Sequence, residues 1–178
     1  MNRTLRRLTA LGATAAALAG GSTALAGASP AAMAASIPRC LNSQLTASAF
    51  EPTGGGAAGS VYLHLVFHNK SAATCHLYGY PGVSAVGTHG NQLGDAATRD
   101  GGTAQYVNIA PGQNAHAVLR YSDVVATDPA SAPAHANGFR IYPPGDYYAM
   151  YAPYGTTAPT RTGSAYEFLQ VSRVAPGR

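Results

Sequence analysis

Apolar and polar residues alternate most clearly between residues 61 and 68. The odd positions are all apolar, whereas the even positions mix apolar and polar side chains: Val61, Leu63, Leu65 and Phe67 against Tyr62, His64, Val66 and His68. This period of two is typical of a strand in an antiparallel sheet that is packed on one face. The pattern breaks at residues 69–71, which are typical of a turn. A second strand is expected to begin at Cys75 and to end before a turn at Pro81-Gly82.

Shorter strands are expected along the rest of the chain, with loops between them. The expected strands are 44–50, 83–86, 92–93, 105–109, 115–121, 139–142, 147–151 and 166–174, and the expected loops are 51–59, 87–102, 124–137 and 153–163. Pro111-Gly112 and the segment 143–146 each predict a hairpin turn. Segment 124–137 reads as a loose crossover or a single helical turn. In the last strand Tyr166, Phe168 and either Leu169 or Val171 are expected to point inward.

Short strands with turns at near-regular spacing, and no convincing helix, indicate an all-β fold. The prediction is an immunoglobulin-like antiparallel β-sandwich, preceded by a signal peptide. Arg3, Arg6 and Arg7 precede a short apolar run and small residues, as in secretory signals. The run is too short and too rich in glycine for a stable membrane span.

The domain prediction is therefore a cleaved signal peptide at 1–35 and one secreted domain at 36–178, with cleavage after residue 26, 34 or 35. The Arg6-Arg7 pair makes twin-arginine export an alternative to ordinary secretion. Removing the three leader arginines from 11 basic residues leaves eight against seven acidic ones, a net charge of +1. This balance supports neither nucleic-acid nor anionic-membrane binding.

Two cysteines, Cys40 and Cys75, lie in the part expected to be exported. In an oxidising compartment an even number of cysteines indicates a disulfide. This bridge would close a loop of about 36 residues and contribute roughly 3–4 kcal/mol in the chain-entropy model. Free thiols or a metal pair are the alternatives.

The histidines suggest a possible copper or zinc site. His64 and His68 share one strand face but lie about 13 Å apart along it, which is too far for one metal without a sharp bend. His76 on a neighbouring strand would have to approach one of them. Solvated or hydrogen-bonded sheet histidines are the alternative interpretation.

Catalytic patterns are weak. No G-x-S-x-G motif is present, and the seven acidic residues are scattered. The prediction is therefore a non-enzymatic protein with no cofactor.

The tyrosines are the most suggestive feature. All 11 lie after the leader, and five gather around one predicted hairpin: Tyr142, Tyr147, Tyr148, Tyr151 and Tyr154. Alternation places Tyr147 and Tyr151 on one face and Tyr148 on the other, so one set is expected in the core. The outer set would form a stacking platform for a sugar or a protein, with Tyr142, Tyr148 and Tyr154 as candidates. Ordinary packing in a sheet is the alternative.

Several segments together resemble one known family. They are Cys40, L-x-L-x-F-x-N at 63–69 followed by Cys75, L-x-G-Y-P-G-V at 77–83, I-x-P-G at 109–112 before A-x-A-x-L at 115–119, and F-R-I-Y-P-P at 139–144. The pattern resembles the DUF4232 family, secreted or lipoprotein β-sandwich proteins of actinobacteria. The resemblance implies a fold and a location, but no catalytic residue.

Many members of that family carry a second cysteine pair, which this chain lacks at 135–138 and 162–165. Its C-terminal half is therefore expected to be held by packing alone. The resulting hypothesis is a secreted binding domain of the cell envelope, with a cell-wall glycan or a protein as its unknown partner. The metal-binding protein described above is the alternative.

Overall fold

The computed structural model describes residues 36–57, 59–122, 132–163 and 167–178, which belong to one compact unit. The elements are η1 (Asn42–Gln44), β1 (Leu45–Phe50), β2 (Gly56–Ala57), β3 (Ser60–Asn69), β4 (Cys75–Tyr78), β5 (Gly82–Val86), β6 (Gln92–Leu93), β7 (Thr98–Arg99), β8 (Tyr106–Ile109), β9 (Asn114–Ser122), β10 (Pro133–Tyr142), β11 (Met150–Pro159), β12 (Leu169–Val171) and β13 (Ala175–Pro176). The expected leader, residues 1–35, lies outside the described residues.

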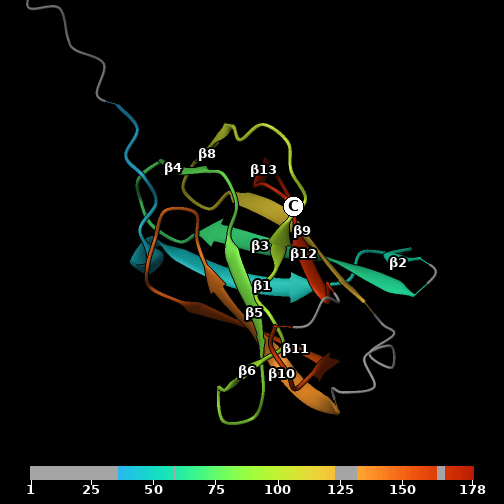
Figure 1. Ribbon diagram of the computed structural model, residues 1–178. Coiled ribbons are helices and arrows are strands. Elements are labelled where there is room, and N and C mark those ends of the chain that lie inside the picture. Colours follow the sequence, from blue (N-terminus) through green and yellow to red (C-terminus); the bar gives the residue numbers. More distant parts are fainter. Residues whose placement is uncertain (1–35, 58, 123–131, 164–166) are drawn as a thin grey trace, which may run out of the picture. The chain divides into compact units, whose positions relative to one another are not determined.

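The described part of the chain forms three sheets, and all three contribute buried residues to one core. The larger sheet has the order β1-β3-β9-β12-β7, with β2 paired to β3 and β13 paired to β9. The second sheet has the order β11-β10-β5-β6, and β4 pairs with β8 in a third. In Figure 1 the strands of the second sheet cross those of the first, and β4 and β8 lie at one end. The prediction of an all-β, sandwich-like fold is confirmed.

The central strand β3 has the two faces that its sequence predicts. Leu63, Leu65 and Phe67 are fully buried, whereas His64 and His68 on the opposite face are partly exposed. β3 pairs with β1 along one edge and with β9 along the other, both antiparallel. The buried face meets Phe139 and Ile141 of β10 in a single hydrophobic core.

The predicted hairpin around Pro111-Gly112 is wrong. The turn itself forms, with a hydrogen bond from the Gln113 amide to the Ala110 carbonyl and with Gly112 at φ 73°. However, the strands on its two sides enter different sheets, because β8 pairs with β4 while both edges of β9 are taken by β3, β12 and β13. Alternation shows which side chains face inward, but it does not show which strands are partners.

The predicted loops at 133–137 and 153–159 are also wrong, because β10 begins at Pro133 and β11 continues to Pro159. Prolines suggested loops there, but Pro133 is the first residue of its strand. Pro153 and Pro159 lie in β11, which is an edge strand of its sheet. An edge strand tolerates a missing N–H group. The hairpin around 143–146 is confirmed, since β10 and β11 pair antiparallel, but its second strand begins at Met150 instead of Tyr147. Residues 124–131 of the predicted crossover lie outside the described residues.

The C-terminal strand is shorter than predicted. Phe168, Leu169 and Val171 are all buried, while Tyr166 lies outside the described residues. Inward packing of Phe168 and Leu169, adjacent in sequence, departs from the expected alternation. β12 also pairs with β7 in parallel, unlike the purely antiparallel sheet expected. The short strands β2 and β7 lie in segments expected to be loops.

The disulfide joins the N-terminal segment to the first residue of β4. Cys40 and Cys75 are bonded, fully buried, and have Cα atoms 4.8 Å apart. Backbone hydrogen bonds reinforce the link, from the Cys40 amide to the His76 carbonyl and from the His76 amide to the Pro38 carbonyl, both 2.9 Å. The predicted pairing of the two cysteines is therefore present.

Asn69, at the end of β3, is a fully buried polar residue that joins three segments. Its amide nitrogen donates to the carbonyls of Ala73 at 2.8 Å and Ile109 at 2.9 Å. Its side-chain oxygen accepts from the Ser71 amide at 3.0 Å and the Ser71 hydroxyl at 2.7 Å. All four hydrogen-bonding positions of the side-chain amide are thus used. They connect β3, the turn before β4, and the end of β8.

Replacing both cysteines with alanine should lower the free energy of unfolding by about 3–4 kcal/mol, because the unfolded chain regains the entropy of a closed loop. Urea unfolding measures this difference. Wild-type protein unfolded with reductant is the control, and its stability should approach that of the double variant. A loss below about 1 kcal/mol would show that the bridge does not restrict the unfolded chain.

The Asn69→Ala substitution should lower the free energy of unfolding by about 2–4 kcal/mol, because the buried Ile109 carbonyl would lose a donor and a cavity would remain. Ser71→Ala is the matched control, since it removes one hydroxyl from the same network. It should cost less than about 1 kcal/mol. Equal losses for the two variants in urea unfolding would contradict the central role of the Asn69 amide.

Candidate functional site: the tyrosine turn

The turn between β10 and β11 presents two neighbouring tyrosines to solvent. Tyr147 is 92% exposed and Tyr148 is 75% exposed. Both precede β11, so strand alternation does not apply to them and neither enters the core. We call residues 143–148 the tyrosine turn.

Asp146, together with Arg39 and Asn42, fixes the backbone of the tyrosine turn. The Asp146 carboxylate accepts hydrogen bonds from the Tyr148 amide at 3.0 Å and the Asn42 amide at 2.9 Å. The Asn42 side chain donates to the Tyr148 carbonyl at 2.8 Å, and the Arg39 guanidinium donates to the Gly145 carbonyl. Gly145 has φ 74°, which suits a residue without a side chain. The tyrosine turn is therefore held in place by Arg39 and Asn42, which lie about a hundred residues earlier in the sequence.

Electrostatics keeps the Asp146 carboxylate ionised. Hydrogen bonding from the Tyr148 amide lowers the pKa of Asp146 most strongly. Burial opposes this shift, and the Asn42 and Tyr147 amides and the Arg39 charge lower the pKa further. The ionised carboxylate is the form that accepts these hydrogen bonds. Ordering of the turn is thus coupled to the charge on one side chain.

The other candidate tyrosines do not share this position. Tyr154 lies between the sheets, with its ring 6.0 Å from that of Phe139 and 6.2 Å from that of Tyr121 between centroids. Burial and the neighbouring Tyr121 hydroxyl raise the pKa of Tyr154. Tyr142, at the end of β10, is half-buried opposite Gly82. Of the three residues predicted as a platform, only Tyr148 lies in the tyrosine turn.

The predicted metal ligands lie in different surroundings. His68 on β3 contacts the Asn114 side chain at 2.9 Å, and His76 on β4 contacts the Ile37 carbonyl at 2.9 Å. His64 instead stacks on His116 of β9, with ring centroids 4.7 Å apart. Burial, and secondarily the charge of His116, lowers the pKa of His64.

Sequence reasoning missed the His64–His116 pair. Both residues lie on the partly polar faces of neighbouring strands, but only the register brings them together. Within 36–57, 59–122, 132–163 and 167–178, no group of three or more His, Cys, Asp or Glu side chains is arranged to hold a metal ion. Metal binding by His64 or His68 with His76 stays a prediction.

With this geometry in view, comparison with known proteins identifies the family. The model of the family described as "Domain of unknown function (DUF4232)" matches residues 40–175. The chain belongs to the DUF4232 family. Among curated proteins, and among solved structures, nothing matches it.

The match to the DUF4232 model covers both strands of the β10–β11 hairpin and both cysteines. It therefore confirms the resemblance drawn from the motifs. No helix in the described part of this DUF4232 domain is long and apolar enough to cross a membrane.

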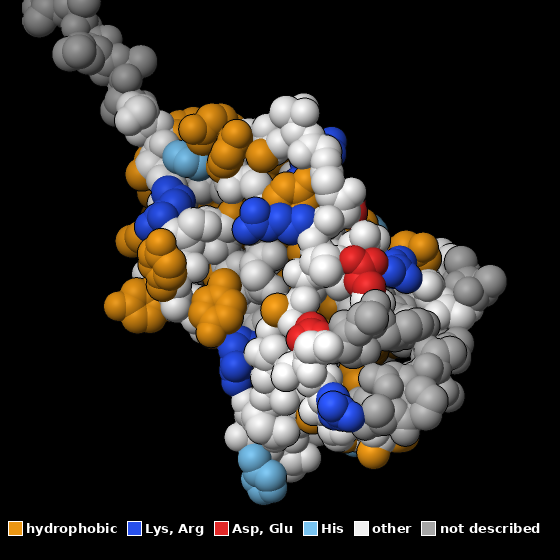
Figure 2. Space-filling model, in the orientation of Figure 1, with side chains coloured by type: hydrophobic (Ala, Val, Ile, Leu, Met, Phe, Trp, Pro, Cys, Tyr) orange, Lys and Arg blue, Asp and Glu red, His pale blue; other side chains and the backbone are white. Residues whose placement is uncertain are grey.

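The surface of the DUF4232 domain carries further exposed aromatic residues. On β4 and β8, Tyr78 and Tyr106 have ring centroids 4.6 Å apart, and His76 packs edge-on against Tyr106 at 4.9 Å. In Figure 2 hydrophobic side chains gather along the side of the molecule nearest the N-terminal segment, with Lys and Arg side chains between them. The tyrosine turn is distinct in that its two rings are adjacent in sequence and share one hydrogen-bonded support.

The Asp146→Asn substitution should lower the melting temperature at pH 7 by about 2–4 °C, because the amide is a weaker acceptor than the carboxylate. The folded-state pKa of Asp146 lies below its unfolded value. Its stabilising contribution is thus present above about pH 4 and is lost as the pH falls through the lower, folded-state pKa. The difference between wild type and variant should therefore shrink in acid. Asp100→Asn, the same change at an exposed position, is the control for net charge; a difference that persists unchanged to pH 2 would contradict this account.

Proposed function

We propose that this DUF4232 protein is an exported, non-catalytic domain of the cell envelope that binds a polysaccharide through Tyr147 and Tyr148. The observation that carries the proposal is the pair of exposed rings at consecutive residues, 92% and 75% exposed, on a turn held by Asp146, Asn42 and Arg39. Rings on a fixed backbone lose little conformational freedom on binding. Their flat apolar faces suit stacking against sugar rings.

The predicted signal peptide and the disulfide support export. The bridge between Cys40 and Cys75 is compatible with an oxidising compartment outside the cytoplasm. It also connects the part of the chain that supports the tyrosine turn to β4, because Asn42 and Arg39 lie on either side of Cys40. An oxidising environment would thus favour the ordered form of the binding surface.

The state of Asp146 supports binding over catalysis at this turn. Hydrogen bonds from two backbone amides engage its carboxylate and lower its pKa. A general acid near neutral pH needs a raised pKa, and a general base needs a free lone pair directed at the substrate. Asp146 is built to hold the turn instead.

The small extent of the turn favours a glycan over a protein partner. Stable protein interfaces bury about 800 Å² on each side around an apolar centre. The turn offers two exposed rings from consecutive residues, which matches one or two sugar units.

The test is binding of the purified protein to protease-treated cell-wall polysaccharide from the producing organism, followed by sedimentation. The double substitution Tyr147→Ala and Tyr148→Ala should weaken binding at least about tenfold, because stacking of two rings is lost. Tyr106→Ala is the matched control, since it removes a ring that is 69% exposed on β8. It should bind as the wild type does.

Two results would overturn the proposal. Unchanged binding by the double variant would remove the tyrosines from the contact. Binding to untreated envelope that disappears after protease treatment would show that the partner is a protein.

A further inference from the structure

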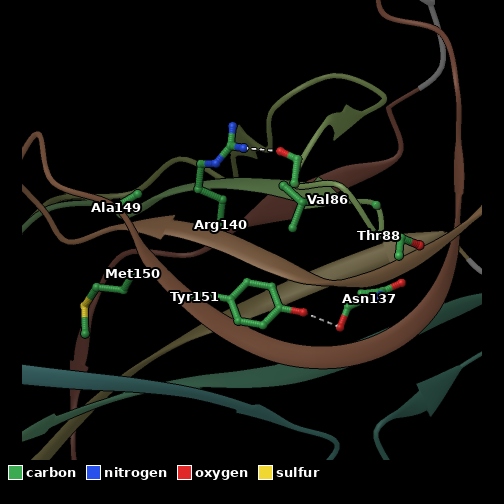
Figure 3. A pocket seen from close by; sticks show the side chains of 9 residues that line it. Val86, Thr88, Asn137, Arg140, Ala149, Met150 and Tyr151 are labelled. Atoms are coloured by element: carbon green, nitrogen blue, oxygen red, sulfur yellow. Dashed lines mark hydrogen bonds between the residues drawn. The ribbon is translucent and has the colours of Figure 1, made fainter.

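A second candidate site lies on the outer face of the second sheet, where a pocket of about 350 Å³ opens beside β10. It is lined by the end of β5, the loop that follows, a central part of β10 and the beginning of β11. Figure 3 shows Arg140, Thr88, Asn137 and Tyr151 around it. This volume is at the lower end of the range for small-molecule sites.

Asn137 lines the pocket and carries a buried, unpaired acceptor. The pairing register of β10 and β11 shifts between Ala136 and Gly138, and such irregularities re-aim the side chain between them. The side-chain oxygen of Asn137 is buried without a hydrogen-bonding partner; among the described residues only His64 Nδ1 shares this condition. Leaving a buried polar atom unpaired is unfavourable, so this irregularity beside the pocket costs the sheet stability.

Arg140 gives the pocket its charge. It is the only charged residue in the lining, and its guanidinium donates to the Gly90 carbonyl in the loop after β5. This contact orients the guanidinium, while other N–H groups of its five remain for a ligand. A planar guanidinium with two parallel donors matches a carboxylate.

Tyr151 gives the pocket a fixed wall. Its hydroxyl donates to the Asn137 carbonyl at 2.8 Å, and its ring is 52% exposed. The ring lies over Gly138, where a Cβ atom would stand 2.8 Å from the ring carbon Cζ. Glycine at 138 therefore permits the position of the ring, which offers a flat apolar face beside the charged and polar groups.

We propose that this pocket binds a small carboxylate that also carries a ring, as a cyclic sugar acid does. Arg140 binds the carboxylate, and Tyr151 packs against the ring of the ligand. None of these residues belongs to the tyrosine turn, so the proposal does not depend on the polysaccharide contact at Tyr147 and Tyr148.

The test is titration of the ¹⁵N-labelled protein with glucuronate at fixed salt and pH, with glucose as the neutral probe. Glucuronate should shift the amide signals of Thr88, Asn137 and Ala149 in a saturable way, and glucose should bind at least about tenfold more weakly. Arg140→Gln should weaken glucuronate binding by a similar factor, and Arg140→Lys should restore part of it, because the charge returns without the two-pronged geometry.

Arg173→Gln is the matched control, since it makes the same charge change at an exposed position outside the pocket. It should leave glucuronate binding unchanged, and the amide spectrum of each variant verifies its fold. Absence of saturable shifts with glucuronate, or equal binding of glucose, would overturn the proposal. Equal weakening by Arg173→Gln would do the same, because it would show attraction to net charge alone.

Discussion

The fully buried amide of Asn69 is the interaction on which the arrangement of strands most depends. It holds the end of β3 to the turn before β4 and to the end of β8, and it donates a hydrogen bond to the buried Ile109 carbonyl. Cys75, paired in register with Ile109, then carries the disulfide to Cys40. The Asn69 side chain thus joins the sheet of β4 and β8 to the end of β3. The disulfide joins the same sheet to the segment around Cys40.

This connection continues to the surface. Cys40 places Arg39 and Asn42 beside the β10–β11 turn, where they bind Gly145, Asp146 and Tyr148. The exposed tyrosines are therefore held from outside their own hairpin, by a segment whose position depends on the disulfide. The pocket at Arg140 is held differently, by a register shift within the sheet and by a ring that covers Gly138.

The sequence was sufficient for features set by local pattern. Alternation at 61–68 predicted the buried face of β3, and the two cysteines predicted their pairing. The sequence did not predict which strands pair with one another in a sheet. β8 and β9, for example, are joined by a turn but belong to different sheets. The prolines of β11 led to the prediction of a loop there, but an edge strand tolerates proline. The supports of Tyr147 and Tyr148, and the meeting of Arg140 with Asn137 and Tyr151, depend on long-range contacts that periodicity does not encode.

The prolines of β11 also matter when many copies of the domain are crowded together. β11 runs for ten residues at the margin of its sheet, a length that would ordinarily offer a neighbouring chain a row of backbone donors and acceptors. Pro153 and Pro159 remove two of those donors. Growth of one molecule onto the next by backbone pairing along this strand is thereby disfavoured.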